Sequence, residues 1–477
     1  AMTAYGLSLL GNNQSYTLNN TSNNFFSSLS ASIGTGTLTF VNSNPINIGS
    51  FNGTTGVTAA SVSLTSPGLT GSANITTTSA STVAITNASN SYEYSGVMSG
   101  PIALTKSGAG TEILSGNNTY SGTTTISAGT LQIGNGGTTG SLANASGSVT
   151  DNGNLVFNRS DAYTYSGAIS GTGSVTQNGS GSLTLNALDS YSGATTINAG
   201  TLIIPSTGKI YYNPSVNIGA TLTVNSGTTL DIQSWDWGGS IANLLYDTSN
   251  FVINGGTVRV SGPSSNSAAG TNLSSRSFTI GAGGATFVNA TAGTTWTIDR
   301  DSRSNYQANM VGNVTFAGPG NFIFNQYLTG AGKTVTMNGT GSLTLGGTDS
   351  YTGATTVVSG GTLIAGNNSA FGSSAITVPN GASLNLNGYS IGNGLTLGGL
   401  GVGGNGALYN SSSNAASISG NMSLTTDTSI KSKNSGGLTL GAVNGAYALS
   451  IDTSGSSSDG SFTQSGAVGA AAALTSY

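Results

Sequence analysis

The stretch Ser107–Ile133 reads SGAGTEILSGNNTYSGTTTISAGTLQI, and two later stretches repeat its pattern. These are Asn178–Ile204 (NGSGSLTLNALDSYSGATTINAGTLII) and Asn338–Ile364 (NGTGSLTLGGTDSYTGATTVVSGGTLI). Each contains alternating apolar residues, a tyrosine followed by Ser or Thr and Gly, two threonines, a β-branched residue, and then Gly, Thr and Leu. Recurrence of one pattern along a chain indicates a fold built from stacked, similar units.

The spacing of these landmarks indicates duplicated blocks. Tyr120 precedes Tyr191 by the same distance along the chain as Tyr94 precedes Tyr165. Two landmarks with a common offset are the sign of a repeat and not of chance composition. Tyr120, Tyr191 and Tyr351 recur at equivalent places, so we predict that they stack as a structural ladder in the core.

Apolar residues alternate with polar ones inside each block. In the second block the apolar positions are Leu183, Leu185, Ile197, Leu202 and Ile204. A period of two is typical of short β-strands that bury one face. Gly-rich pairs supply turns between them. The sequence therefore predicts an all-β protein, and we find no helical period in it.

Composition excludes several kinds of function. Of 477 residues only 5% are charged, the formal net charge is −4, and there is no Cys and no His. Ten Lys and Arg residues are too few to neutralise a nucleic-acid backbone, and no apolar run is long enough for a membrane span. We expect no disulfide, no cofactor, no Cys or His metal site and no His-based catalysis. A Cys-free chain rich in Ser, Thr, Asn and Gly suits secretion across a bacterial envelope.

The repeated pattern Gly-x-Gly-x-Leu-x-Leu, then Tyr-Ser-Gly-x-Thr-Thr-Ile, then Gly-Thr-Leu resembles the passenger-associated β-strand repeat of bacterial autotransporter proteins. Residues 406–440 resemble the segments between such repeats in those passengers. The resemblance implies a parallel β-helix at the cell surface. It implies an architecture and an export route, and it does not imply a particular activity.

We therefore predict an elongated, right-handed parallel β-helix (β-solenoid) with about 20–25 residues per coil. The predicted division is an N-terminal cap or exchanged strand at 1–30, a solenoid at 31–460 and an incomplete terminal repeat at 461–477. Repeat blocks are expected near 94–133, 165–204 and 327–364. Candidate subunit-joining residues lie near the two ends: Leu9, Leu10, Phe25, Phe26, Phe462, Leu474 and Tyr477.

Three tryptophans are candidates for glycan binding. Trp235, Trp237 and Trp296 are all the tryptophans of the chain. Exposed aromatic rings can stack on sugars, whereas buried rings would fill the core where a coil bulges. We favour the core role, because large apolar side chains are usually buried.

Two other motifs have functional alternatives that we do not favour. Asp299 and Asp301 lie beside Arg300 and Arg303, so that they form a surface ion-pair cluster more readily than a glycan-cleaving acid/base pair. Residues 401–406 match G-x-G-x-x-G, but no helical pattern follows, so we expect a turn and not a nucleotide site.

The function expected from these features is structural: a subunit of an extracellular filament or matrix, joined head to tail with other copies of itself. The alternative is an autotransporter-type adhesin passenger that binds glycans or neighbouring cells. We expect an extracellular or cell-surface location, no enzymatic activity and no nucleic-acid partner.

Overall fold

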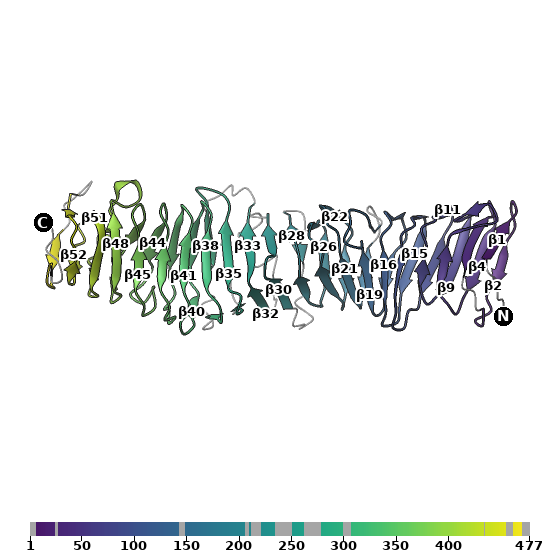
Figure 1. The fold of residues 1–477 in the computed structure, drawn as a ribbon, viewed down its shortest axis with the longest axis horizontal. Coiled ribbons are helices and arrows are strands. Elements are labelled where there is room, and N and C mark those ends of the chain that lie inside the picture. The colour runs from purple at the N-terminus through teal and green to yellow at the C-terminus, as the bar shows by residue number, and fades with distance from the viewer. Residues whose placement is uncertain are drawn as a thin grey trace. The chain divides into compact units, whose positions relative to one another are not determined.

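The computed structural model describes residues 6–23, 27–142, 148–205, 209–210, 221–233, 250–261, 278–298, 307–433, 435–454 and 461–469. The chain falls into two compact units. Unit 1 comprises Ala1–Thr223 with Tyr246–Thr248, and unit 2 comprises Val224–Leu245 with Ser249–Tyr477. Figure 1 labels the strands in chain order.

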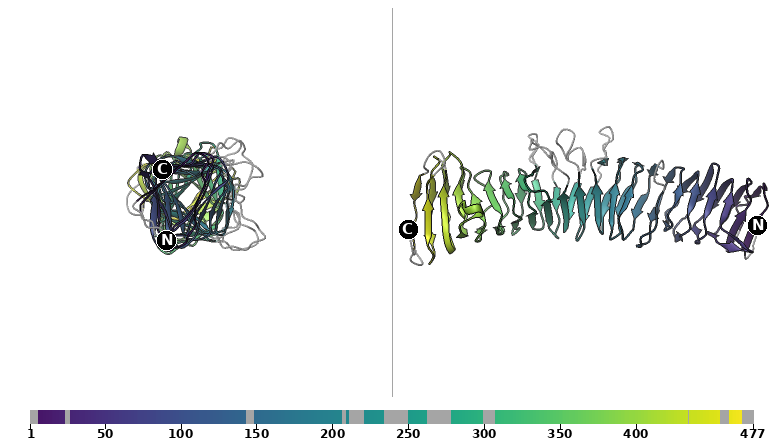
Figure 2. Two further views of the ribbon diagram at one scale, coloured as in Figure 1. Left: turned by 90° about the vertical axis from the view of Figure 1, so that its right-hand side faces the viewer. Right: turned by 90° about the horizontal axis from the view of Figure 1, so that it is seen from above.

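Unit 1 is a stack of parallel coils, whose strands are brief and line up in ladders (Figures 1 and 2). The first ladder contains β1 (Gly6–Leu10), β3 (Ser28–Ser32), β5 (Ile46–Ile48), β8 (Val57–Ala59), β10 (Leu69–Thr70), β11 (Ile75–Thr77), β14 (Met98–Gly100) and β17 (Thr119–Tyr120). The second contains β2 (Tyr16–Leu18), β4 (Thr37–Val41), β9 (Ser61–Ser66), β12 (Ser81–Ile85), β15 (Ile102–Lys106), β18 (Thr124–Ile126), β20 (Val149–Asp151), β23 (Ile169–Gly171), β26 (Leu188–Tyr191) and β29 (Lys209–Ile210).

Two further ladders complete the coils of unit 1. One contains β13 (Ser91–Tyr94), β16 (Thr111–Leu114), β19 (Thr130–Ile133), β21 (Asn154–Phe157), β24 (Ser174–Gln177) and β27 (Thr195–Ile197). The other contains β22 (Tyr163–Tyr165), β25 (Ser182–Leu185) and β28 (Thr201–Ile204). The boundary between the units falls within β30 (Thr221–Asn225).

Unit 2 is built in the same way, from parallel ladders of consecutive coils. Its first strands are β31 (Thr229–Ile232), β32 (Asn250–Asn254), β33 (Gly256–Val260), β34 (Phe278–Ile280), β35 (Ala285–Asn289), β36 (Thr295–Ile298), β37 (Gln307–Met310), β38 (Val314–Ala317), β39 (Asn321–Phe324), β40 (Tyr327–Thr329), β41 (Val335–Asn338), β42 (Ser342–Leu345) and β43 (Thr355–Val357).

The later strands of unit 2 continue these ladders and add one of their own, formed by β47 (Ser390–Ile391), β50 (Ala416–Ile418), β52 (Leu438–Leu440) and β55 (Phe462–Gln464). The others are β44 (Thr362–Ala365), β45 (Ile376–Val378), β46 (Ser383–Asn385), β48 (Leu395–Gly399), β49 (Leu408–Asn410), β51 (Met422–Ser432), β53 (Val443–Asn444) and β54 (Leu449–Asp452).

The strand register confirms the predicted parallel β-solenoid. Thr105 of one coil pairs with Thr125 of the next, and Ile126 pairs with Asp151 of the coil after that. One coil therefore takes about the predicted number of residues. In the described part of the chain the helical content is one 3₁₀ turn, η2 (Val402–Gly404). Within the same part, no helix is long and apolar enough to cross a membrane.

Alternation along each strand places the core inside the coils. Strands such as β9 and β15 alternate buried and partly exposed residues throughout their length. The alternating apolar residues of the second block, Leu183, Leu185, Ile197, Leu202 and Ile204, are at most 1% exposed. Burying one large apolar side chain contributes about 1.5–3 kcal/mol, and register stacking repeats this contribution from coil to coil.

Polar side chains also point inward at several corners, where they satisfy turn carbonyls. Asn87 Nδ2 donates to the carbonyls of Asn90 and Thr111 at 2.6 and 3.0 Å. Gln177 Nε2 donates to the Gly179 carbonyl at 2.9 Å. These bonds matter because a buried carbonyl without a partner is costly.

Candidate binding surface and buried polar residues

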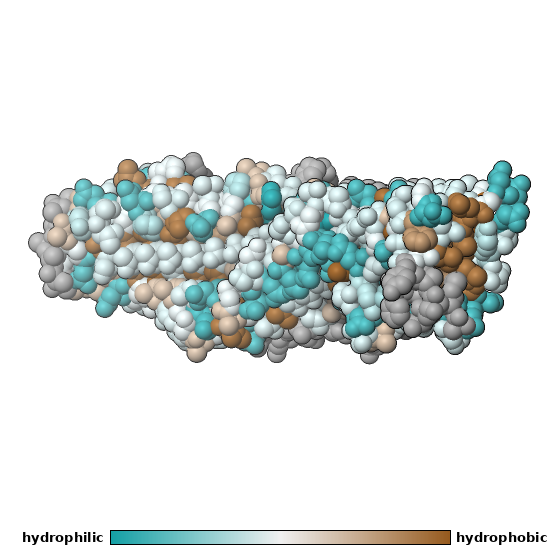
Figure 3. All heavy atoms as spheres, turned by 45° about the vertical axis from the view of Figure 1, so that its right-hand side comes forward, coloured by the Kyte–Doolittle hydropathy of each residue, from teal (hydrophilic) through white to brown (hydrophobic). Residues whose placement is uncertain are grey.

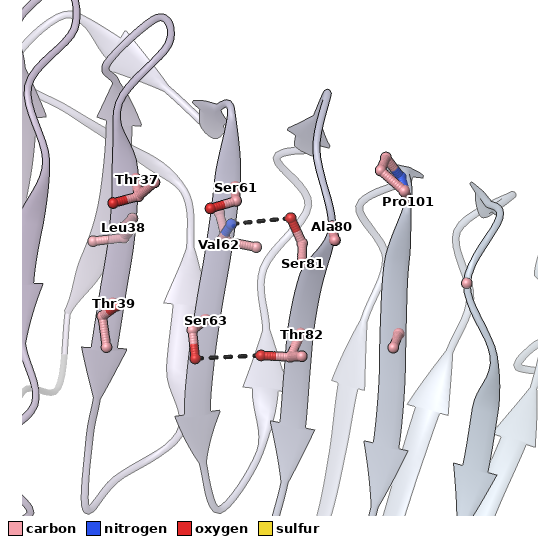
Figure 4. A pocket seen from close by; sticks show the side chains of 12 residues that line it. Thr37, Leu38, Thr39, Ser61, Val62, Ser63, Ala80, Ser81, Thr82 and Pro101 are labelled. Carbon is pink, nitrogen blue, oxygen red and sulfur yellow. Dashed lines mark hydrogen bonds between the residues drawn. The ribbon is translucent and has the colours of Figure 1, made fainter.

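A shallow depression of about 380 Å³ lies on the outer face of unit 1, across strands β4, β9, β12 and β15. Figure 4 shows its side chains, which project from successive coils. They are small, and many carry hydroxyl groups. The lining residues are Thr37, Leu38, Thr39, Ser61, Val62, Ser63, Ala80, Ser81, Thr82, Pro101, Ala103 and Gly122.

The depression arises directly from the alternation of the sequence. Residues such as Leu38 and Val62 point into the core, so their neighbours Thr39 and Ser63 point outward. The Thr82 hydroxyl donates to Ser63 Oγ at 3.2 Å, which links two coils on this face. No lining residue is charged. The surface can therefore offer hydroxyl donors and acceptors to a neutral ligand, but it holds no carboxylate, amine or imidazole for acid/base chemistry.

Exposed large hydrophobic side chains are dispersed along the described chain. The face drawn in Figure 3 is mostly of intermediate hydropathy. The exposed fraction of these side chains runs from 37% to 64%, and they are Leu10, Phe51, Leu188, Val311, Leu400, Tyr447 and Val468. Near the N-terminal end, Figure 3 shows a group of apolar side chains, and there Phe51 packs against Gly6 of the strand that ends at Leu10.

The three recurrent tyrosines are buried, and each makes the same kind of hydrogen bond. Each phenol oxygen lies 2.6–2.7 Å from the hydroxyl of the threonine four residues further along the chain: Tyr120 with Thr124, Tyr191 with Thr195, and Tyr351 with Thr355. Burial raises the pKa of all three phenols above the usual range. The rings therefore fill the core as neutral hydrogen-bonding groups.

The register corrects one aspect of the predicted tyrosine ladder. Tyr120 pairs with Gly100 in the adjacent coil, and Tyr191 pairs with Gly171. Because the duplicated block spans more than one coil, equivalent tyrosines recur several coils apart. Tyr120 and Tyr191 therefore occupy equivalent places in their own repeats, each paired with a glycine of the adjacent coil and not with another of the three tyrosines.

Trp296 is excluded as an exposed sugar platform. Its side chain is 0% exposed and packs in β36 against Phe287 and Phe322, with both ring-centroid distances at 5.8 Å. An aromatic cluster of this kind buries much apolar surface, which is why the core alternative prevails at this position. Trp235 and Trp237 lie outside the described residues, as do Asp299 and Asp301.

Of the candidate subunit-joining residues, Leu9 is buried within its own chain. It lies in β1, which pairs with β3 in parallel register, so its side chain is not available to a neighbouring subunit. Leu10 is 50% exposed, and Phe462 is partly exposed in β55, which pairs with β52 of the same chain. Phe25, Phe26, Leu474 and Tyr477 lie outside the described residues.

The glycine-rich segment 401–406 forms a turn around η2, as expected. Gly401, Gly403 and Gly404 have positive φ angles of 77°, 59° and 71°. Glycine readily adopts this left-handed backbone conformation, which is incompatible with the start of a right-handed α-helix. The segment therefore lacks the helix N-terminus that a dinucleotide phosphate requires.

A set of buried charged and ionisable residues was not predicted from the sequence. Lys106 is 0% exposed, and its Nζ donates to the carbonyls of Ser107 and Gly108 at 2.9 and 2.8 Å. Glu112 is also 0% exposed, and its Oε1 accepts the backbone N–H of Leu69 at 3.1 Å. Burial raises the pKa of the Glu112 carboxyl well above its usual range. The signal was present, because Lys106 follows Ile102 and Leu104 at the inward positions of one strand.

Comparison with known proteins locates the repeats. The family model of the passenger-associated-transport-repeat matches residues 104–133, 175–204 and 335–365. The adhesin BmaC autotransporter of Brucella suis biovar 1 (strain 1330) is 54% identical over 72 residues, a match that spans 15% of this chain and 2% of the adhesin. No solved structure matches the chain significantly. The chain therefore carries the passenger-associated-transport repeat, folded as coils of a parallel β-solenoid, and over 72 residues it is similar to an autotransporter adhesin.

Proposed function

We propose that this chain is part of an adhesin-type passenger exposed at the cell surface, where its coils present a hydroxyl-lined face to a neutral glycan. The passenger repeats and the match to an autotransporter adhesin support the surface location. The observation that carries the binding role is the depression across β4, β9, β12 and β15, whose lining is rich in Ser and Thr and lacks charge.

The chemistry of this lining favours reversible binding. Each Ser or Thr hydroxyl can donate one hydrogen bond and accept two, which matches the mixed donors and acceptors of a sugar. The absence of charged lining residues disfavours an acidic or basic ligand. Because the depression is shallow and spans several coils, an extended oligosaccharide that lies across the strands fits it better than a compact ligand. In this proposal the chain is a binding module and not an enzyme.

The head-to-tail filament that we expected from the sequence stays a prediction. It depends on the chain ends, and Phe25, Phe26, Leu474 and Tyr477 lie outside the described residues. The passenger repeats and the adhesin match favour the adhesin alternative over the filament.

The binding role can be tested with a substitution in the depression. Ser63→Lys places a long, charged side chain among small hydroxyl groups. The purified chain is applied to an array of immobilised neutral oligosaccharides. We expect wild-type binding to be saturable and the apparent affinity of S63K to fall by about tenfold or more, which corresponds to about 1.4 kcal/mol.

Thr344→Lys is the matched control. Thr344 occupies a partly exposed, outward position of β42 in unit 2, so that this variant adds the same side chain to a comparable strand away from the depression. T344K should bind as the wild type does, and both variants should keep the wild-type circular dichroism spectrum. Equal binding by S63K and the wild type, or equal loss in both variants, would remove the depression as the binding surface.

A further inference from the structure

One position of the repeat, just before the buried tyrosine, carries a polar side chain in every block. Its side-chain oxygen accepts a backbone N–H from the preceding coil. The bonds are from Met98 to Asn118 at 2.9 Å, from Ile169 to Asp189 at 2.8 Å, and from Leu328 to Asp349 at 2.8 Å. We call this hydrogen bond between a backbone N–H of one coil and a side-chain oxygen of the next the inter-coil joint. It is formed by asparagine in the first repeat and by aspartate in the second and third.

The second polar atom of this side chain distinguishes the three joints. In the first repeat, Asn118 Nδ2 donates to the carbonyls of Gly116 and Ser141, both at 3.0 Å. In the other two, Oδ2 of Asp189 and Oδ2 of Asp349 are buried and have no hydrogen-bond partner among the described residues. A carboxylate would place an uncompensated negative charge on this buried, unpartnered oxygen, whereas a neutral carboxylic acid, like the neutral amide of asparagine, places no charge there.

No cation is among the groups that shift the pKa of Asp189 or Asp349. The nearest basic residue along the ladder is Lys209 of β29, which pairs with Leu188, while Asp189 itself pairs with Ile210. The side chains of Asp189 and Asp349 are 1% and 6% exposed. The ionisable groups that interact with Asp189 are the phenols of Tyr165 and Tyr191, and Tyr351 is the corresponding group for Asp349.

The ion pairs of the described residues, Arg159 with Asp161 and Lys431 with Asp452, involve neither buried aspartate. Burial raises the pKa of Asp189 from its usual 3.8 to about 7, and it raises the pKa of Asp349 well above the same usual value.

We propose that Asp189 and Asp349 are neutral carboxylic acids that stand in for asparagine in the folded chain, and that their ionisation loosens the inter-coil joints of the second and third repeats. The joint of the first repeat, built on Asn118, lacks this response. The contacts between coils at these two positions are therefore most stable in acid and weaken towards neutral and alkaline pH. This inference does not depend on the proposed adhesive function.

The sign follows from proton linkage. A folded-state pKa above the unfolded value means that the folded chain binds more protons, so stability falls as pH rises. For Asp189 the loss begins near the unfolded pKa of about 3.8 and is complete above the folded pKa of about 7. Glu112 and Asp151 are other buried carboxyls with raised pKa values, so the total pH slope of the wild type is not diagnostic. The diagnostic quantity is the difference between matched variants at one pH.

The experiment exchanges the two residue types between repeats, with Asp189→Asn, Asp349→Asn and the reciprocal Asn118→Asp. Amide hydrogen exchange is measured on the full chain at pH 4.5 and pH 8, and each variant is compared with the wild type at the same pH. At pH 8 we expect protection in the altered repeat to rise about tenfold or more in D189N and D349N, and to fall about tenfold or more in N118D. These factors correspond to one pKa unit or more. At pH 4.5 the differences should be small.

Asp161→Asn serves as the control, because Asp161 is an ion-paired carboxyl whose pKa is lowered by its bond to Arg159. D161N should not gain protection at pH 8. A measurement on the wild type avoids dependence on variant folding: in a chain with ¹³C-labelled aspartate carboxyls, the Asp189 signal should titrate near pH 7, and the Asp349 signal should titrate well above the usual 3.8. Titration of every aspartate at or below about pH 4, or equal protection of N118D and the wild type at pH 8, would overturn the proposal.

Discussion

At the scale of the residue, the thin core depends on polar groups that are paired inside it. The alternation of the second repeat correctly predicted which apolar residues point inward, such as Leu183 and Ile197, because a period of two fixes the face of a strand. The same alternation runs through the buried Lys106 and Asp189, but their burial was not predicted, and periodicity does not show how a buried polar group is hydrogen-bonded. Their partners are backbone groups of neighbouring coils, which no sequence pattern marks.

The buried tyrosine–threonine bond gives a prediction at this scale. Tyr191→Phe keeps the ring but leaves the Thr195 hydroxyl without its phenol partner. We expect the free energy of unfolding to fall by about 1 kcal/mol, measured by urea denaturation. Tyr447→Phe is the control, because Tyr447 is 41% exposed, and its effect should lie within about 0.5 kcal/mol. Equal effects of Y191F and Y447F would contradict a structural role for the phenol.

At the scale of the element, each coil must let the next one approach to within strand spacing. Gly171 ends β23 with a φ of 107°, and a Cβ atom there would lie 2.1 Å from the Asp151 carbonyl oxygen of the adjacent coil. The sequence predicted turns rich in glycine but did not show which glycines meet a neighbouring backbone. It also did not show that coils differ in length, although Thr125 lies closer along the chain to its partner Thr105 than to its partner Thr150.

Gly171→Ala tests this close approach. The substitution combines a disfavoured backbone conformation with a clash against the backbone, so we expect a destabilisation of about 2 kcal/mol or more by urea denaturation. Gly137→Ala is the matched control, because a Cβ atom at Gly137 meets nothing within 4 Å. The free energy of unfolding of G137A should equal that of the wild type or exceed it by up to about 1 kcal/mol, as at other glycine sites where alanine fits. If G171A were as stable as G137A, the close contact between Gly171 and the adjacent coil would be contradicted.

At the scale of the whole molecule, stacking is the source of stability in each unit. A single coil buries only a few large apolar side chains, and most strands are very short, so no coil is expected to fold alone. The sequence established the repeat and the all-β class, because these follow from recurrence and alternation, whereas the length of a coil was an assumption of the solenoid prediction. The sequence did not predict the proposed binding face. The depression in unit 1 depends on small outward residues that lie almost entirely outside the matched repeats.

The most direct test of parallel, in-register coils uses the natural absence of cysteine. Thr105→Cys with Thr125→Cys places two thiols on directly paired, outward positions of β15 and β18. Adjacent strands are about 4.8 Å apart, which is within the Cα separation that a disulfide spans. Thr105→Cys with Thr150→Cys is the control, because Thr125 lies between them in the ladder and the separation doubles to about 9.6 Å.

Both double variants are oxidised while folded, and the cross-linked peptides are identified by mass spectrometry. The parallel solenoid predicts a disulfide between positions 105 and 125 in nearly all molecules and none between positions 105 and 150. Efficient cross-linking of positions 105 and 150, or its failure at positions 105 and 125, would contradict the stacked coils from which the rest of the description follows.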